Sequence, residues 1–396
     1  MASAAHTIAV APAALPPLPD EILEDIFLRL DDMADLARAA ASCTSFRQLV
    51  TARRFLRRFR SLHAPPILGF LASDHLQFCP VDPPHRSAAA GAALAQAAVF
   101  DFSFLNRGKC WSVRDVRGSR VLLAPKGGIY RPFEYLMVCD PLHRRYVSIP
   151  PIPGYEYDTR ATSRHQRLGV MDVEPFLDPA SKEEEDLAFR VISIVLFRSK
   201  VVAMVFSSDT GKWETATTFT YDYAPFVRYY AHNCFYWTHW TRDDVLVLNP
   251  LEMEFSAVNI PLGLHDHDMS DIAIVNSGES RLGLLAFGSD ESCLELYSKS
   301  MSNNGVGTED WQHDRTIPLP NCHFTMIGAP EGHLVLHGVE RGWRKKPKYA
   351  GKDQERQYFI VDLKALLVER LCVFDPAGHH VYPYASFLPP FSLPSV

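Results

Sequence analysis

One short pattern recurs five times between residues 140 and 371 of this 396-residue chain. In each copy an apolar run leads into a polar turn, and a second run that carries an aromatic residue follows, often with a proline behind it. The turns start at Asp140, Asp209, Asn249, Lys299 and Asp362, at intervals of 69, 40, 50 and 63 residues. A repeat of about 40–50 residues that holds roughly four strands is typical of a β-propeller blade. The spacing therefore predicts an all-β propeller.

The runs around these turns have the composition of strands. From Ile67 onward, short apolar stretches such as Arg190–Phe197 (RVISIVLF) and Val201–Phe206 (VVAMVF) alternate with Gly, Pro, Asn and Asp. That alternation indicates a mainly antiparallel fold. At roughly 50 to 55 residues per blade, the region predicts about six blades, with an irregular first blade over Phe70–Phe104. A pair of β-sandwiches is the alternative architecture.

A different periodicity occupies Leu18–Val50, which predicts three short helices. Pro19 suits the first helical position, where its missing N–H is not needed. Ser42 or Thr44 can cap the third helix. The apolar residues fall at helical spacing, and those of the first helix draw one stripe along one face. They are Ile22, Leu23, Ile26, Phe27 and Leu30 in the first helix, Leu36, Ala37, Ala40 and Ala41 in the second, and Cys43, Phe46, Leu49 and Val50 in the third.

Three helices of about 10 residues are too small to be stable alone, because chains below roughly 40 residues usually need outside help. The pattern leaves two explanations open: a module that completes its core on a partner protein, or a cap that packs on its own downstream domain. Arg53–Arg60 continues as a basic amphipathic helix, whose Phe55, Leu56 and Phe59 are expected to pack inward; an RNA-binding patch is the alternative. The proline pair after Ala64 ends this helix, so we place the domain boundary there.

The helical stretch resembles the F-box motif. The resemblance rests on the Leu18-Pro19 start, Ile22-Leu23, Ile26-Phe27, Leu30, Leu36, Cys43, Phe46-Arg47 and Leu49. Asp31, Ser42 and Phe46 depart from the Pro, Val and Trp that are common in the family. The continuation Phe55–His63 resembles the segment after the F-box in a large group of grass proteins, and the hairpin repeat loosely resembles the F-box-associated β domains of plants.

The resemblance implies a non-catalytic subunit of a ubiquitin ligase. F-box modules dock on the Skp-type adaptor and, through it, on cullin, so the propeller would act as the substrate receptor that holds an unidentified target protein for ubiquitination. The expected domains are the F-box module over residues 15–63 and the propeller over 64–396. A disordered leader is expected over residues 1–14, because they are small and apolar, lack a basic region and are interrupted by proline. The implied adaptor-binding residues are Leu18, Pro19, Ile22, Leu23, Ile26, Phe27, Leu30, Leu36, Cys43, Phe46 and Leu49.

Composition narrows the location and the partners. A net charge of −6 and a pI of about 6.2 argue against a nucleic-acid-binding protein. The eight cysteines are dispersed and contain no C-x-x-C pair, so we expect reduced thiols in a cytoplasmic or nuclear protein, with a disulfide framework as the alternative. No uninterrupted apolar run reaches 18 residues, so we expect no membrane partner.

No pattern for a catalytic or metal site is complete, and we expect no cofactor. His265–Asp268 (HDHD) has metal-ligand residue types but no identifiable third ligand, so a polar turn is the simpler explanation. The ring-rich stretch Tyr221–Trp240 is expected to pack inside a blade, with Tyr221–Tyr230 as its more exposed part. Two segments, Tyr155–Asp186 and Ser300–Asp310, are longer than blade turns need and are candidate recognition loops. A propeller scaffold outside a ligase and a propeller enzyme are the rival functions; the enzyme predicts acidic or His residues that converge on the central channel.

Overall fold

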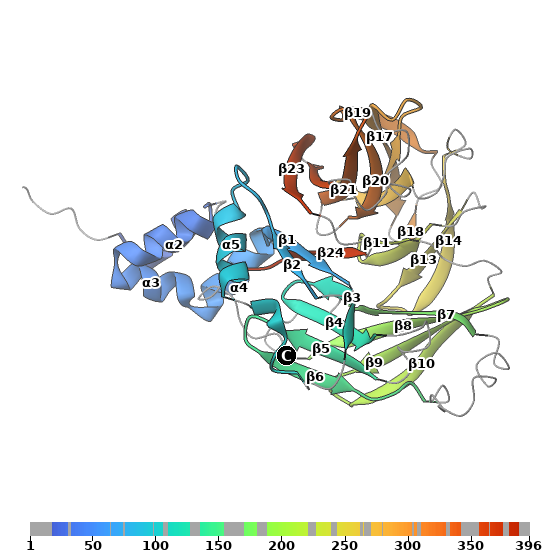
Figure 1. Ribbon diagram of the computed structural model, residues 1–396, viewed down its shortest axis with the longest axis horizontal. Helices are drawn as coiled ribbons and strands as arrows, with labels where there is room; N and C mark the ends of the chain where they lie inside the picture. The colour runs from blue at the N-terminus through green and yellow to red at the C-terminus, as the bar shows by residue number, and fades with distance from the viewer. Residues whose placement is uncertain are drawn as a thin grey trace, which may run out of the picture. The chain divides into compact units, whose positions relative to one another are not determined.

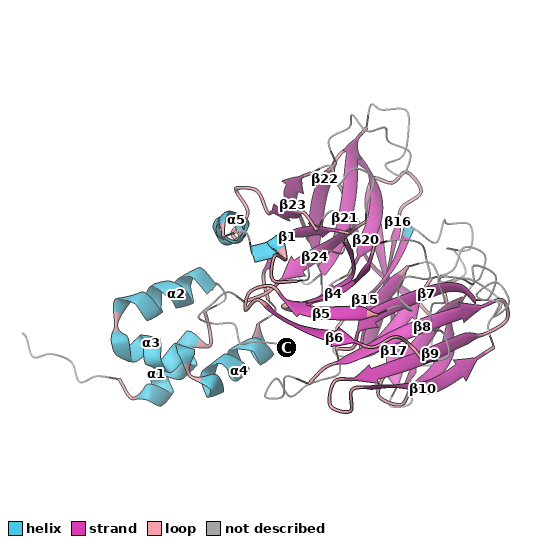
Figure 2. Cartoon of the chain, turned by 60° about the horizontal axis from the view of Figure 1, so that its bottom comes forward, coloured by secondary structure: helices cyan, strands magenta, loops and turns pink. Residues whose placement is uncertain are grey.

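The chain divides into two compact units, Met1–Ala64 and Pro65–Val396. The computed structural model describes residues 18–30, 33–63, 65–73, 76–97, 99–105, 110–126, 135–153, 170–179, 188–220, 227–238, 244–261, 264, 271–278, 280–302, 305–306, 310–329, 333–341, 356–363, 365–374 and 380–387. Figure 2 shows the first unit as helices and the second as strands, with one further helix and a short 3-10 turn.

Four helices form the first unit: α1 (Asp20–Phe27), α2 (Met33–Ser42), α3 (Thr44–Thr51) and α4 (Arg53–Leu62). The first three confirm the predicted helical stretch. Two predicted boundary roles were wrong. Pro19 is the N-cap of α1 and not its first helical residue, because its ψ of 147° is extended. Cys43 is the N-cap of α3, and Ser42 instead donates its hydroxyl back to the Ala39 carbonyl oxygen at 2.7 Å.

The helical unit has buried apolar side chains from each of the four helices or the turns that follow them. They are Phe27, Leu28, Leu36, Val50, Phe55, Leu56 and Phe59, all at most 6% exposed. The Phe27 and Phe46 rings meet edge to face at a centroid distance of 5.1 Å. Helix α4 is tied back to α1, since His63 Nε2 lies 2.7 Å from the Leu28 carbonyl oxygen and Arg58 pairs with Glu24. The inward packing expected for Phe55, Leu56 and Phe59 is therefore present.

The described strands of the second unit form six antiparallel sheets, which we number as blades 1 to 6, and they confirm the all-β fold with six propeller blades. Blade 1 contains β1 (Ile67–Ala72), β2 (Phe78–Pro80) and β24 (Val381–Ala385); blade 2, β3 (Trp111–Arg117), β4 (Arg120–Pro125), β5 (Leu136–Asp140) and β6 (Arg145–Ile149); blade 3, β7 (Val170–Leu177), β8 (Arg190–Phe197), β9 (Val201–Ser207) and β10 (Lys212–Phe219); blade 4, β11 (Arg228–Ala231), β12 (Cys234–Trp237), β13 (Asp244–Asn249) and β14 (Glu254–Asn259); blade 5, β15 (Ile272–Asn276), β16 (Arg281–Phe287), β17 (Cys293–Ser302), β18 (Gly305–Val306) and β19 (Gln312–Pro318); and blade 6, β20 (Cys322–Gly328), β21 (His333–Glu340), β22 (Gln357–Asp362) and β23 (Leu367–Val373).

Blade 1 closes the ring, because it joins the two ends of the propeller. Its sheet order is β2-β1-β24, so the first strand of the domain pairs with the last, with Phe70 opposite Pro383. Figure 1 shows β24, in red, beside the blue β1. The expected irregularity of the first blade has two sources: this borrowed strand, and the helix α5 (Ala88–Gln96), which contacts β1 and β2. Sequence reasoning had not identified α5 as a helix.

Four of the five predicted repeat turns lie at the hairpins that end blades 2, 3, 4 and 6, as between β5 and β6, where Asp140 pairs with Arg145. The turn predicted at Lys299 was wrong, because Lys299 lies inside β17 and pairs with Leu282, and the outer edge of blade 5 is formed by β19 on β17. The strands at the outer edges are largely exposed, notably β6, β10, β14 and β19. First strands of successive blades contact one another instead, as β3 does with β7 and β11 with β15. The repeat therefore marks the outer edge of blades 2, 3, 4 and 6, and the first strands line the centre.

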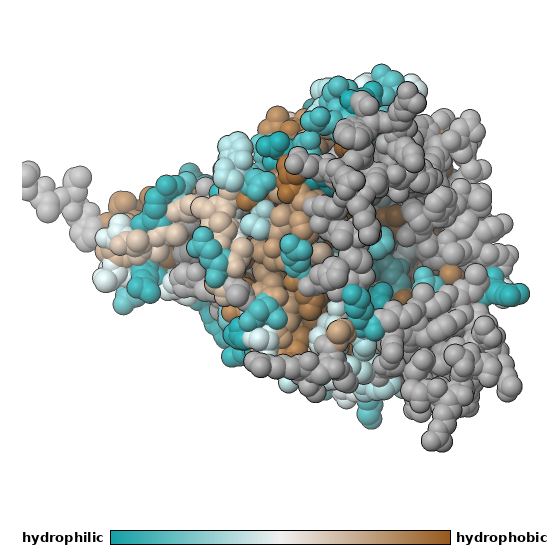
Figure 3. Space-filling model, in the orientation of Figure 1, coloured by the Kyte–Doolittle hydropathy of each residue, from teal (hydrophilic) through white to brown (hydrophobic). Residues whose placement is uncertain are grey.

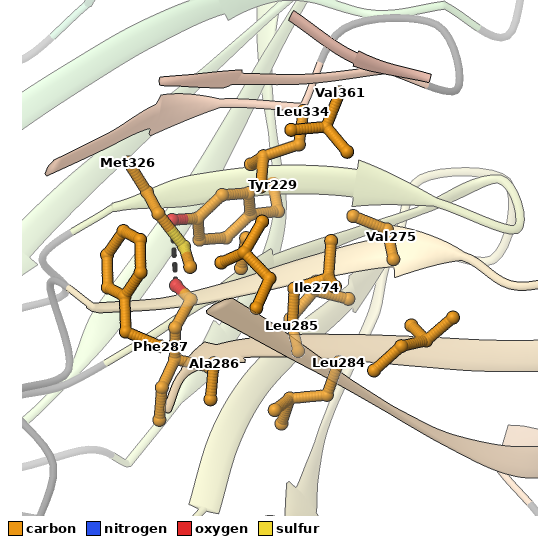
Figure 4. Packing of buried hydrophobic residues seen from close by; sticks show 14 of the residues in the cluster. Tyr229, Ile274, Val275, Leu284, Leu285, Ala286, Phe287, Met326, Leu334 and Val361 are labelled. Atoms are coloured by element: carbon orange, nitrogen blue, oxygen red, sulfur yellow. Dashed lines mark hydrogen bonds between the residues drawn. The ribbon is translucent and has the colours of Figure 1, made fainter. Parts of the chain in front are cut away.

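Apolar clusters fill every junction between neighbouring blades in the described part of the propeller. The largest spans blades 4, 5 and 6, and Figure 4 shows Tyr229, Ile274, Leu285 and Met326 meeting within it. Four further clusters lie between blades 1 and 2, 2 and 3, 3 and 4, and 6 and 1. Because each sheet is covered on both faces, the sequences of its middle strands are continuous apolar runs.

Candidate functional site

Helix α1 carries two apolar faces, and the structure divides the stripe that we had expected to be one. Phe27 is 6% exposed and faces the core, with Leu23 half-buried one turn before it. Leu18, Ile22 and Ile26 are 52%, 48% and 45% exposed. They follow one another at four-residue steps, so they lie on one side of the helix or its entry. On the view in Figure 3, the helical unit shows brown and tan apolar surface beside teal polar surface.

We call Leu18, Pro19, Ile22 and Ile26 the α1 outer face. Pro19 is exposed as well, and its carbonyl oxygen accepts the N–H groups of Ile22 and Leu23 at 3.1 Å, which starts the helix. The carboxylates of Asp20 and Glu21 stand in the first turn, where the helix dipole favours negative charge. Nothing in the described helical unit covers this face. An uncovered row of large aliphatic side chains on a stable helix is a surface suited to a protein partner.

The other expected adaptor-binding residues occupy different environments. Leu36 is fully buried and supports the core, as Phe27 does. Leu23, Leu30, Phe46 and Leu49 are half-buried. Cys43 is exposed at the start of α3, and the backbone N–H groups of Phe46 and then Ser45 lower the pKa of its thiol.

A second arrangement, which sequence reasoning missed, lies where the inner strands of blades 2, 3 and 4 meet. The Arg228 guanidinium on β11 bonds to Asp115 on β3 at 3.0 Å and to Glu174 on β7 at 2.8 Å. It also lies 4.2 Å from the centre of the Phe176 ring. We call Arg228, Asp115 and Glu174 the central ion cluster. The sequence feature that could have indicated this cluster was the presence of charged residues within the three otherwise strand-like runs that became β3, β7 and β11.

Further donors hold both carboxylates of the central ion cluster. Asp115 accepts the Leu177 N–H at 2.8 Å, and Glu174 accepts the Trp237 indole N–H at 2.8 Å. A bulge in β3 next to Asp115 re-aims the side chains there. Burial by itself lowers the pKa of Arg228. The negative charges of Glu174 and then Asp115 raise it, and together they outweigh burial, so the pKa of Arg228 lies above its usual value. The cluster therefore has acids near the centre, as a propeller enzyme would, but both are bound to one arginine that stays charged.

Several expected features fall elsewhere. Tyr229 had been placed in the more exposed part of the ring-rich stretch; this was wrong, because it is 2% exposed and donates its hydroxyl to the Ile272 carbonyl oxygen at 2.8 Å. Cys234–Trp237 is the strand β12, with its three rings buried, as expected.

Outside the described residues lie Tyr221–Phe226, the HDHD turn His265–Asp268 and, within the first candidate recognition loop, residues 155–169 and 180–186. The prediction of one long loop over Tyr155–Asp186 was wrong, because Val170–Leu177 within it is the strand β7. The second candidate loop, Ser300–Asp310, likewise contains the end of β17 and the strand β18.

The described residues hold neither a metal site nor a membrane-spanning helix. They contain no group of three or more His, Cys, Asp or Glu side chains placed to bind a metal. Among the same residues, no helix is both long enough and apolar enough to span a membrane.

Comparison with known proteins identifies the first unit. Residues 15–61 match the F-box-like family, and no curated protein matches the chain. Similar solved structures include a nidogen/laminin complex (9% identity, 79% of this chain and 96% of that chain, TM-score 0.38), a putative TolB from Agrobacterium tumefaciens (10%, 72% and 93%, 0.38) and an oligogalacturonate lyase in complex with manganese (10%, 65% and 62%, 0.36). The chain thus carries an F-box-like domain at residues 15–61, and a six-bladed, all-β propeller domain follows it.

Proposed function

We propose that this protein is the substrate-receptor subunit of a Skp–cullin–F-box ubiquitin ligase. F-box domains generally bind Skp-type adaptors in cullin complexes, and F-box proteins are generally non-catalytic. The observation that carries the proposal is the α1 outer face: within the F-box-like domain, Leu18, Ile22 and Ile26 are each about half exposed. In this role the α1 outer face makes the central contacts with the adaptor. The half-buried Leu23, Leu30, Phe46 and Leu49 and the exposed Cys43 extend the surface, while Phe27 and Leu36 support it from the core.

The propeller supplies the second half of the proposed role. Its sheets are committed to the blade junctions, so a target protein would be held by connecting loops or by the mouth of the channel. The subunit would contribute no reacting group, and its effect would be to hold the target close to the ubiquitin-conjugating enzyme. We place this activity in the cytoplasm or nucleus, where cullin complexes are found.

The exposed fraction of the α1 outer face gives the binding free energy that it can contribute to the adaptor contact. Fully burying a Leu or Ile side chain is worth about 1.5–3 kcal/mol relative to leaving it exposed. Since half of each side chain is already covered, burying the rest of one contributes about 1 kcal/mol. The triple change Leu18→Ala, Ile22→Ala and Ile26→Ala should therefore weaken adaptor binding by about 3 kcal/mol, or roughly 100-fold.

The test is a titration of the full chain with purified Skp-type adaptor. The triple variant should keep its helical circular dichroism, because the altered side chains point away from the core. Ile26→Asp should abolish binding outright, because a partner would have to bury an unpaired carboxylate. Leu62→Ala is the matched control: Leu62 is 63% exposed but lies beyond residues 15–61, so binding should not change. Undiminished binding by Ile26→Asp would rule out this face.

The receptor role needs a separate measurement, because an F-box domain could bind the adaptor without any target being ubiquitinated. Affinity purification of the full chain under proteasome inhibition should recover ubiquitinated proteins. The same purification with the triple variant should recover the target without its ubiquitin. The receptor role fails if the wild type and the triple variant recover the same ubiquitinated proteins, or if neither recovers any. Adaptor binding could still be correct in that case.

A further inference from the structure

Two cysteines face each other at the seam where the propeller ring closes. Cys79 lies on β2 of blade 1 and Cys372 on β23 of blade 6. Their neighbours across each sheet also meet: Cys79 is opposite Phe70, Cys372 is opposite Tyr358, and the Phe70 and Tyr358 rings are 4.9 Å apart. The two sheets therefore stand face to face at this level.

Two hydrogen bonds, one between backbone groups and one to a side chain, hold the two segments in a fixed register. Asp82 donates its N–H to the Leu371 carbonyl oxygen at 2.7 Å, and its carboxylate accepts the Val373 N–H at 3.1 Å. These two bonds bracket Cys372 on its strand. Cys372 belongs to the apolar cluster between blades 6 and 1, and Cys79 packs against that cluster. Both cysteines are free thiols, and their side chains are close enough to shift each other's pKa, while Cys79 Sγ also lies 3.7 Å from the Pro80 carbonyl oxygen.

The two thiols are unequal in the way that a reactive pair requires. Interaction with the Cys372 side chain lowers the pKa of Cys79, against the opposing effects of burial and of Asp82. The same interaction, then burial, raises the pKa of Cys372. Cys79 is also partly exposed, whereas Cys372 is fully buried. Because of this difference in exposure, Cys79 is the thiol that a small oxidant can reach, and Cys372 is a partner shielded from it.

We propose that Cys79 and Cys372 form a reversible disulfide that locks blade 6 to blade 1 under oxidising conditions. The oxidant is hydrogen peroxide. The Cys79 thiolate attacks one peroxide oxygen, the O–O bond breaks, and the products are a sulfenic acid on Cys79 and hydroxide, which takes up a proton to become water. The Cys372 sulfur then attacks Cys79 Sγ and loses its proton, and the sulfenic oxygen leaves as a second water. Two thiols and one peroxide thus give one disulfide and two waters.

The position of the pair decides what the bond would do. Without it, the ring is closed by the pairing of β1 with β24 and by the cluster between blades 6 and 1. A bond between residues about 290 positions apart in the chain would restrict the unfolded ensemble strongly, because the effect grows with the length of the closed loop. The expected result is a rise in melting temperature of about 5 °C for the oxidised protein.

The experiment uses the full chain, first reduced with dithiothreitol and then treated with hydrogen peroxide. Mass spectrometry of an unreduced digest should find a linked pair of peptides that contain Cys79 and Cys372. The melting temperature should rise on oxidation and return on reduction. Cys79→Ser should abolish both effects. Cys372→Ser should leave a sulfenic acid on Cys79, which dimedone traps. Cys293→Ser is the matched control, because Cys293 is also partly exposed, and it should behave as wild type.

Two outcomes would overturn the proposal. One is oxidation that leaves Cys79 and Cys372 unlinked while other cysteines react first. The other is a linked pair that leaves the melting temperature unchanged. If Cys372→Ser does not fold, Cys79→Ser still decides the question, because Cys79 is not fully buried and serine fits its place.

Discussion

Removing Arg228 should destabilise the propeller, because it leaves two carboxylates near the centre without their cation. The Arg228 and Asp115 side chains are 12% and 9% exposed, so their pair is largely desolvated. Breaking such a pair by deleting one partner costs about 3–5 kcal/mol. The Glu174 side chain is 40% exposed and solvent screens much of its interaction, so we assign it little of the total. We expect Arg228→Met to lower the free energy of unfolding by about 3 kcal/mol.

Thermal and urea unfolding of the full chain would measure this loss. For a domain of this size, about 3 kcal/mol corresponds to a fall in melting temperature of roughly 4 °C. Arg228→Lys should fall between the wild type and Arg228→Met, because a single ammonium cannot bond both carboxylates in the same fork geometry. Arg144→Met is the matched control: this arginine is 50% exposed and pairs with an exposed Asp101 at 3.6 Å, so the loss should stay below about 1 kcal/mol.

Two measurements show whether the stability lost in Arg228→Met comes from unpaired charges or from lost packing. Adding Asp115→Asn and Glu174→Gln to Arg228→Met removes the unpaired charges and should restore part of the stability. In Arg228→Met alone, the buried carboxylate should have a pKa above its unfolded value, so the deficit should shrink as the pH falls. A variant that melts within 1 °C of the wild type, or a deficit that is the same at every pH, would refute the reasoning (the 1 °C margin is about the shift expected for a neutral surface change).

Two more predictions concern the inner strand β24 and the independence of the propeller. Burial and then Asp115 raise the pKa of Tyr382 from 10.0 to about 12. The protonated Tyr382 therefore contributes up to about 3 kcal/mol to the free energy of unfolding. This contribution is complete below pH 10 and is lost as the pH rises towards 12, because Tyr382 loses its proton in the unfolded chain first. Urea midpoints between pH 9 and 11 should fall less steeply for Tyr382→Phe, and parallel curves would contradict this assignment. Residues Pro65–Val396 alone should unfold cooperatively with a β-rich circular dichroism spectrum and bind no adaptor, because all five apolar clusters lie within them; a helical spectrum would contradict this.

Local patterns determined the parts of this protein that depend on residues near one another in the chain. The helices α1 to α3 follow from apolar spacing over about ten residues, and four of the five outer hairpins follow from a turn residue with a strand on each side. Both features are decided within a few turns or one hairpin, where the chain has little choice of partner. The number of blades followed from the length of the region after Ile67 at roughly 50 to 55 residues per blade.

Tertiary structure alone decided which residues meet across the ring. Nothing near Asp115 in the sequence indicates that its partner is Arg228, which is more than a hundred residues away, or that Cys79 faces Cys372. The closure of β1 by β24 is of the same kind. Even within α1, spacing could not tell Ile22 and Ile26 from Leu23 and Phe27, because an apolar side chain looks the same whether it faces its own core or a partner. Which of them is buried depends on where α3 and α4 pack, and that is a property of the folded unit.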